Sequence, residues 1–180
     1  MDKRSRYAAV AFVTLLAAAT ACSDDGTVPA DDELTMLLSV QPAGGSVGVD
    51  GGTTVVVRFD HAIAEGMEDW AALHEGSVTG PEVTGTWTRS SDGTALTFTP
   101  DAPLKPATTY AIHLGGGMMD AYGHLVDLGT HGGAMGGQWA TQSMMTGGMM
   151  GGQTGTHMGV GWQHPANGTY GMVFVFTTAG

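Results

Sequence analysis

Cysteine and basic side chains are scarce in this sequence. Cys22 is the only cysteine among 180 residues, so the chain can form no internal disulfide. Lysine and arginine together number 6 against 17 acidic residues, which gives a formal net charge of −11 at pH 7. A surface this acidic repels phosphate backbones, so we expect no nucleic-acid partner.

The N-terminal hydrophobic run is short. Residues 8–19 are apolar, follow a basic stretch at residues 3–6, and are too few to cross a bilayer as a helix. This layout is typical of a secretory signal, so we expect residues 1–21 to be removed on export.

Small residues precede the cysteine in the run Ala19-Thr20-Ala21-Cys22. The run resembles a bacterial lipobox, in which the thiol is acylated and the cysteine becomes the new N-terminus; Ala19 stands where leucine is usual. The same residues also fit an A-x-A site for ordinary signal peptidase, which would cut the same bond. The resemblance implies a lipid anchor on Cys22, and Ser23 in place of aspartate favours sorting to the outer membrane.

The mature chain divides by composition into a tether and a β-rich body. Residues 22–33 are acidic and nearly free of large hydrophobes, so we expect a tether without a core. From Leu34 onward, short alternating segments lie between Gly, Pro and Asp clusters, which predicts an all-β sandwich. Strands are expected at residues 36–40, 53–59, 83–88, 95–99, 110–114 and 172–177. The one helical pattern, at residues 62–75, places Ile63, Met67, Trp70 and His74 three to four residues apart, and Gly66 limits any helix there to a turn or two.

Glycine and methionine dominate residues 129–171, and no Asp, Glu, Lys or Arg follows Asp127. So much glycine is costly to order, so we expect an irregular loop insertion before the last strand. Without it, residues 34–128 and 172–180 make up about the 100 residues of an immunoglobulin-like (Ig-like) β-sandwich.

Several segments resemble the SbsA-type bacterial Ig-like domain. They are VQPAGGSVGVDGGTTVVVRFDHAI, the run DGTALTFTPDAPLKPATTY, MMDAYGHLVD and the terminal MVFVFTT. In this sequence Asp92-Gly93 is suited to a tight hairpin turn, and Tyr110 stands where such sandwiches place a corner tyrosine. The resemblance implies the fold, while such modules serve as spacers, adhesive units or ligand-binding domains.

Two motifs have structural interpretations that we prefer to catalytic ones. Residues 44–48 spell G-x-S-x-G, but no helix pattern follows Ser46, so a glycine-rich turn is expected rather than a nucleophile elbow. The acidic residues Glu65, Glu68, Asp69 and Glu75 lack the spacing of a calcium loop, and we interpret them as a solvated face.

The insertion contains the strongest chemical signal, a set of soft ligands. Thioethers and imidazoles together favour cuprous copper, so the candidate metal ligands are Met144, Met145, Met149, Met150, His157 and Met158, with His131 and His164 nearby. The same composition also fits a low-complexity segment whose methionines contact a partner protein. The other histidines, His61, His74 and His113, are scattered and are expected at surface or strand positions.

A second resemblance is to copper-resistance carriers of the CopC type, which are also Ig-like sandwiches with methionine-rich loops. Their Asp-x-His motif is longer here, Asp120-Ala121-Tyr122-Gly123-His124, so only a methionine-based site carries over. We therefore expect a non-enzymatic envelope lipoprotein that acts as a structural or partner-binding module, with another envelope protein as a candidate partner. The alternative is a copper carrier or buffer that uses the Met/His-rich loop.

Overall fold

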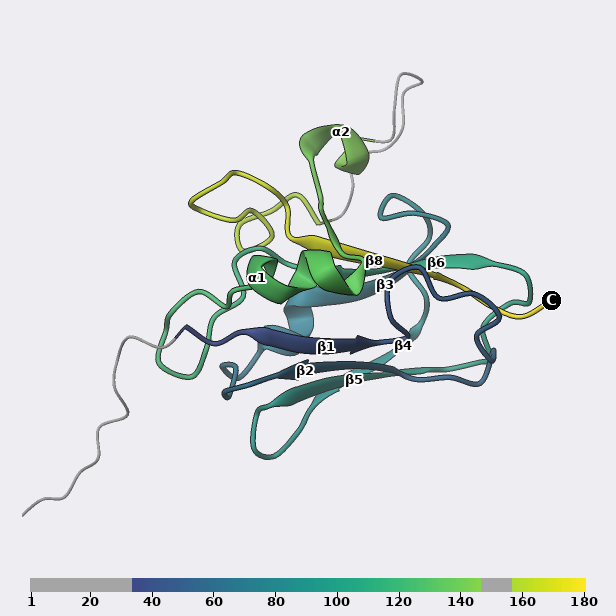
Figure 1. Cartoon of the computed structure of the whole chain (residues 1–180), viewed down its shortest axis with the longest axis horizontal. Helices are drawn as coiled ribbons and strands as arrows, with labels where there is room; N and C mark the ends of the chain where they lie inside the picture. The colour runs from purple at the N-terminus through teal and green to yellow at the C-terminus, as the bar shows by residue number, and fades with distance from the viewer. Residues whose placement is uncertain (1–33, 147–156) are drawn as a thin grey trace, which may run out of the picture. The chain divides into compact units, whose positions relative to one another are not determined.

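Two antiparallel sheets form the body of the protein. The structure is a computed structural model and describes residues 34–146 and 157–180. One sheet has the order β1-β2-β5-β4 and the other β3-β6-β8-β7 (Figure 1). The strands of the first are β1 (Leu37–Gln41), β2 (Val55–Phe59), β5 (Ala95–Pro100) and β4 (Gly85–Arg89). Those of the second are β3 (Ala71–Glu75), β6 (Thr109–Leu114), β8 (Met172–Thr177) and β7 (Gln138–Trp139). The predicted all-β sandwich is confirmed.

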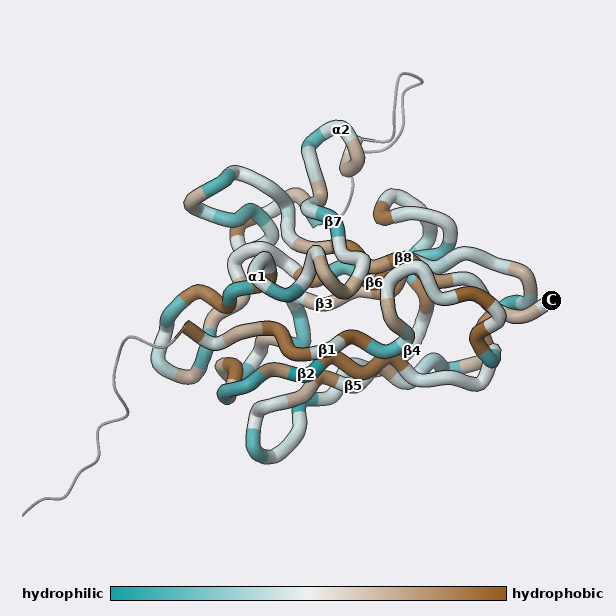
Figure 2. Tube along the Cα trace, in the orientation of Figure 1, coloured by the Kyte–Doolittle hydropathy of each residue, from teal (hydrophilic) through white to brown (hydrophobic). Residues whose placement is uncertain are grey.

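The core lies between the two sheets and follows the alternation of the strands. Val55, Val57 and Phe59 of β2 are buried, and Val57 pairs with Leu96 of β5. Ile112 on β6 faces them from the second sheet, within the same hydrophobic cluster. Burying one such side chain contributes about 1.5–3 kcal/mol, so these alternating positions hold the sheets together. Figure 2 shows the apolar stretches running along β1, β2 and β5.

Two local features match their predicted roles. Gly93, at φ 75°, makes the turn between β4 and β5, and the Asp92 carboxylate accepts the backbone N–H of Thr94 at 3.1 Å. The hydroxyl of Tyr110 accepts the backbone N–H of Lys105 at 2.8 Å, which fixes the loop before β6. Tyr110 is therefore the corner tyrosine that the sequence predicted.

The helical pattern at residues 62–75 gives one turn, within the limit of a turn or two that Gly66 sets. This 3₁₀ turn, η1 (Met67–Trp70), is preceded by Gly66 at φ 82°. The next residues are strand β3, which pairs with β6 over its whole length and carries His74. Because β3 is buried on both faces, its sequence does not alternate between apolar and polar residues, and the pattern that predicts a strand is absent.

The described part of the glycine- and methionine-rich segment is more regular than its composition predicted. It contains α1 (Gly129–Gly132), η2 (Gly133–Met135), β7 and α2 (Gln142–Met145). Met145 of α2 and Ala140 pack against Ala111 and Val173, which lie on the outer face of the second sheet. Figure 1 shows α2 on the side of β8 away from the first sheet. This segment therefore covers part of the outer face of the second sheet. The division into a sandwich at residues 34–128 and 172–180 and an insertion at residues 129–171 stays a prediction.

Residues 45–49 run beside β8 and close the edge of the second sheet. The N–H of Gly45 donates to the carbonyl of Val175 at 2.7 Å, and the N–H of Thr177 donates to the carbonyl of Ser46 at 2.8 Å. Gly44 touches η2, since a Cβ there would lie 2.6 Å from the carbonyl oxygen of Met135. Gly44 and Gly45 form a turn, and Ser46 follows it beside β8 with no helix after it, as expected of a glycine-rich turn rather than a nucleophile elbow.

Candidate functional site

Two histidines lie side by side on the outer face of the second sheet. His74 on β3 and His113 on β6 are diagonal neighbours, because His74 pairs with Ala111 and His113 pairs with Ala72. The exposed fractions of His74 and His113 are 2% and 0%. Both are therefore buried strand residues, brought together by the register of β3 against β6.

A backbone carbonyl holds each ring. Nδ1 of His74 donates to the carbonyl of Gly80 at 3.1 Å, and Nε2 of His113 donates to the carbonyl of Tyr170 at 2.6 Å. A carbonyl only accepts, so these nitrogens carry the proton and the other nitrogen of each neutral ring has a lone pair. The turn after β3 places the Gly80 carbonyl here, and a Cβ on Gly80 would collide with the carbonyl of Glu75 at 1.8 Å.

Among residues 34–146 and 157–180, the remaining nitrogen of each ring has no hydrogen-bond partner. Nε2 of His74 and Nδ1 of His113 are buried and unpaired, and so is Nε2 of His157. A buried polar atom without a partner costs about 1–3 kcal/mol of stability, so three of them in one place call for a physical reason.

The third histidine comes from the glycine-rich segment. The ring centroid of His157 lies 5.0 Å from that of His74 and 5.8 Å from that of His113, and the His74–His113 separation is 6.3 Å. Its Nε2 lies 3.8 Å from Oε2 of Glu82, which is more than half exposed. We call His74, His113 and His157 the histidine cluster.

Trp162 covers the histidine cluster. Its ring centroid lies 4.6 Å from that of His113 and 4.1 Å from that of His157. The backbone there is held to the end of the sheet, because the N–H of Gly117 donates to the carbonyl of Gly161 at 2.7 Å. Gly161, at φ 93°, passes so close to Trp70 that a Cβ would lie 1.8 Å from its ring, so only glycine fits.

Burial keeps the three rings neutral. It lowers the pKa of His113 to about 3 and the pKa of His157 to about 4. Burial also lowers the pKa of His74, against an opposing contribution from its hydrogen bond to Gly80. At neutral pH the cluster therefore offers lone pairs rather than positive charges.

Of the methionines predicted as metal ligands, two pack on the same face of the sheet as the histidine cluster. Met145 and Met158 pack on the same outer-face cluster as Ala111, the residue paired with His74. Met144 is exposed on α2. Met149 and Met150 lie outside the described residues.

Two predicted histidine ligands have other neighbours. His131 is exposed within α1. Nδ1 of His164 accepts the backbone N–H of Ala166 at 3.2 Å, and the ring packs 5.4 Å from Trp139. Across residues 34–146 and 157–180, no three His, Cys, Asp or Glu side chains are already gathered as a metal site.

The sequence interpretation missed His74 and His113 as site residues. The signal that could have found them is the apolar run on β6, Tyr110-Ala111-Ile112-His113-Leu114, which lacks a polar face. A strand of that kind is covered on both sides, so a histidine within it is buried and needs a partner.

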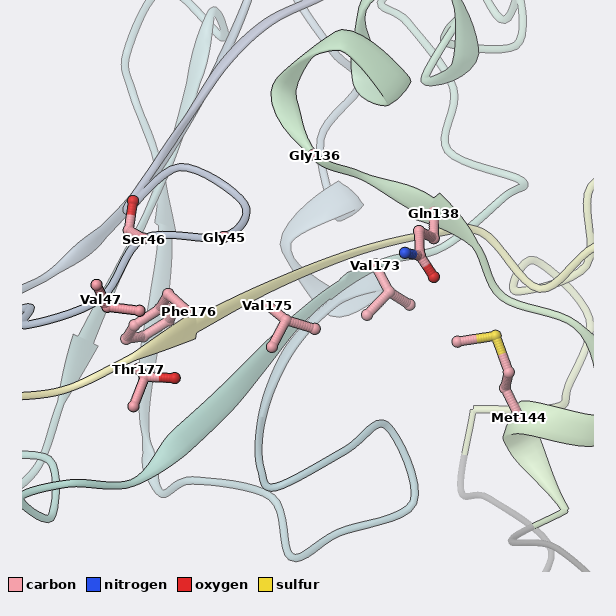
Figure 3. Close-up of a pocket in the computed structure, with 10 residues that line it drawn as sticks. All are labelled: Gly45, Ser46, Val47, Gly136, Gln138, Met144, Val173, Val175, Phe176 and Thr177. Carbon is pink, nitrogen blue, oxygen red and sulfur yellow. The ribbon is translucent and has the colours of Figure 1, made fainter.

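A shallow groove lies farther along β8. It has a volume of about 260 Å³ and is lined by Ser46 and Val47 on one side and by Gln138 and Met144 on the other. Figure 3 shows Val173 and Val175 of β8 lying between these two sides. Other hollows of about 190 and 220 Å³ lie beside residues 51–54 and 81–84. All three are smaller than the 300–1,000 Å³ typical of small-molecule pockets.

The sequence profile described as "Bacterial Ig-like domain" matches residues 31–131. No curated protein sequence matches the chain. Among the described residues, no helix is both long enough and apolar enough to cross a membrane.

Several solved structures are similar. CopC from Methylosinus trichosporium OB3b is 12% identical, with 81% of this chain and 93% of that chain covered and a TM-score of 0.44. PcoC, a methionine-rich copper resistance protein from Escherichia coli, is 13% identical, with 81% and 99% covered and a TM-score of 0.44. The S-layer protein SbsC is 16% identical over 54% of this chain, with a TM-score of 0.39, and the match spans only 13% of that protein. An S-layer protein and CopC-type proteins, the two groups that the sequence motifs resembled, are thus both among the similar structures.

Proposed function

Because the chain belongs to the bacterial Ig-like domain family, we propose that it is a non-enzymatic module of the cell envelope with a structural or partner-binding role. The observation that carries this proposal is the family match over residues 31–131, which includes the strands from β1 to β6. Modules of this fold present loops and edges on a rigid body, and their function depends on those surfaces.

The chemistry of the described surface supports a non-enzymatic role. The G-x-S-x-G motif begins in a turn and runs beside β8, where the Ser46 carbonyl accepts the N–H of Thr177. The hollows described above are small and shallow, with the groove along β8 at about 260 Å³. These three hollows are smaller than typical small-molecule pockets, and the proposal therefore assigns recognition to the surface of the sandwich.

We place the protein in the envelope as an exported lipoprotein. The sequence supports a leader at residues 1–21, lipid on Cys22 and an acidic tether at residues 22–33. The outer membrane is the proposed location, since Ser23 follows the cysteine.

Fractionation of cells tests the anchor. The Cys22→Ser variant should move from the membrane fraction to the soluble fraction, because a chain without the thiol cannot be acylated. The matched variant Ser23→Ala keeps the thiol and should stay with membranes. Membrane association of Cys22→Ser equal to that of the unchanged protein would refute the lipid anchor.

Photo-crosslinking in cells tests the partner-binding role. A photoreactive residue replaces Val47, which is 80% exposed on the sheet-closing segment, or Thr86 on β4 of the opposite sheet. A partner-binding module should give a discrete covalent adduct from one face, and this adduct should weaken when Cys22→Ser removes the anchor. Adducts that are identical from both faces and in both anchor states would argue against a specific envelope partner.

A second candidate function is a soft-metal carrier or buffer, with copper as the ion. The observation that favours it is the position of His157, whose ring lies against two buried strand histidines with unpaired nitrogens. Neutral imidazoles and thioethers are the ligands that copper prefers, and Met158 follows His157 in the chain.

A further inference from the structure

Two of the three rings in the histidine cluster are already oriented by backbone carbonyls. Nδ1 of His74 and Nε2 of His113 donate to these carbonyls, and within the part of the chain that the structure describes their opposite nitrogens are buried without a hydrogen-bond partner, as is Nε2 of His157. In metal sites the ligating histidine donates its other N–H to a carbonyl or carboxylate in this way, which fixes the tautomer and the ring orientation.

We propose that His74, His113 and His157 together bind one late first-row transition-metal ion, copper or zinc. This inference rests on the second candidate function and places its site on the outer face of β3 and β6 rather than among Met144, Met145, Met149 and Met150. The glycine-rich segment then contributes His157 and the cover over the ion, while the sheet contributes the other two ligands.

The ring separations are close to what one ion requires. Imidazoles bound through metal–nitrogen bonds of about 2 Å place their ring centroids roughly 5 Å apart. The separations of 5.0 and 5.8 Å from His157 are near that value, and the 6.3 Å between His74 and His113 is wider. The rings do not yet converge as a metal site among the described residues, so binding has to draw His74 and His113 together. His157 lies outside the strands, so no strand pairing fixes its backbone.

The ligand set selects the class of ion. Neutral imidazole nitrogens suit zinc and copper, whereas calcium and magnesium require oxygen ligands. Glu82 lies beside the cluster, with its Oε2 3.8 Å from Nε2 of His157. It is placed to balance part of the charge of a bound cation, and the acidic chain as a whole attracts cations.

Metal titration of the full chain tests the site. All proteins carry Cys22→Ser, so that the thiol cannot bind the metal. Zn²⁺ is titrated calorimetrically, and Cu⁺ is titrated anaerobically against a competing chelator. We expect one ion per chain. The His113→Gln and His157→Gln variants should each bind at least about tenfold more weakly, since even changes to groups that only support a ligand cost 10–100-fold. The matched control His131→Gln alters an exposed histidine and should bind as the parent does.

A second measurement on the parent needs no substitution in the site. Imidazole ¹⁵N resonances are recorded before and after one equivalent of Zn²⁺. The signals of His74 and His113 should shift strongly, while that of His131 should not. This result keeps the proposal testable where a glutamine variant fails to fold.

The outcomes separate the site from the function. Binding that survives His113→Gln and His157→Gln but is lost when Met149 and Met150 become leucine would overturn this site and leave the soft-metal function standing. The absence of stoichiometric binding of either ion to the parent would overturn both. Shifts confined to histidines outside the cluster would overturn the site alone.

Discussion

Nε2 of His113 donates to the backbone carbonyl of Tyr170 at 2.6 Å, and this hydrogen bond joins the central strand β6 to the glycine-rich segment. The bond fixes the tautomer of His113 and leaves Nδ1 as a buried lone pair. This one hydrogen bond therefore holds the glycine-rich segment on the sheet and orients the ring of His113, a proposed metal ligand. Because the same segment buries His113, its packing on the sheet and the protonation of His113 depend on each other.

Acid should destabilise the metal-free protein through His113. Burial lowers the pKa of this ring to about 3, whereas an unfolded histidine titrates near 6.5. Below pH 6.5 the unfolded state therefore binds more protons than the folded state, and stability falls as the pH falls toward 3. The loss from this ring amounts to about 2 kcal/mol between pH 7 and pH 5.

The measurement is urea unfolding at several pH values with a chelator present. The groups that face His113 are His74 and His157, which also lose charge through burial, with Glu82 at the rim beside His157. The variant His113→Gln should show a shallower dependence on pH than the parent. Equal slopes for the two proteins would contradict the assignment of a buried, neutral His113.

Trp162 should stabilise the cover of the outer face. Its side chain is nearly buried and contacts His113 and His157. Replacing a buried Trp by alanine costs about 3–5 kcal/mol, so Trp162→Ala should lower the free energy of unfolding by an amount near that range. The control is Val160→Ala, because Val160 is 95% exposed in the same segment. Hydrogen exchange should show faster exchange at Gly116, whose N–H donates to the carbonyl of Trp162. Unchanged exchange there would mean that the cover does not depend on this ring.

The sequence predicted those parts of the fold that obey a local rule. Val55, Val57 and Phe59 recur at every second position, so the strand and its buried face could be predicted from their shared side of the strand. Tyr110 and the Asp92-Gly93 turn could be predicted because each has a characteristic local chemistry. These elements depend on residues close together in the chain.

The histidine cluster could not be predicted in the same way. His74, His113 and His157 are far apart in the sequence and meet only through the β3–β6 register and the return of the glycine-rich segment over the sheet. The residues of β3, Ala-Ala-Leu-His-Glu, show no alternation because both faces are covered. The local pattern therefore allowed a surface or a strand position for His74 and did not show that its side chain is buried.

The hydroxyl of Tyr110 should make a measurable contribution to stability. It accepts the backbone N–H of Lys105, and the ring is buried against Phe176 at a centroid distance of 5.6 Å. Tyr110→Phe keeps the ring and removes the acceptor, so we expect a loss of about 1 kcal/mol. Thermal unfolding measures this loss as a lower Tm. Tyr122→Phe is the control, because Tyr122 is exposed. A Tm equal to that of the parent would show that water replaces the hydroxyl at Lys105.

Gly44 should be intolerant of any side chain, because the glycine-rich segment packs against it. A Cβ at Gly44 would lie 2.6 Å from the carbonyl oxygen of Met135 and 2.7 Å from that of Gly136. Backbone atoms cannot move aside as a flexible side chain would, so Gly44→Ala has to separate η2 from the sheet-closing residues 45–49. We expect a loss of about 1–3 kcal/mol in the free energy of unfolding, as for other overpacked sites.

Gly133→Ala is the matched control, since Gly133 has helical angles and open space around its Cβ position. That variant should be neutral or more stable by about 0.4–1 kcal/mol, because alanine reduces the freedom of the unfolded chain. Equal stability of the two variants would mean that the segment after α1 does not rest on the sandwich as described.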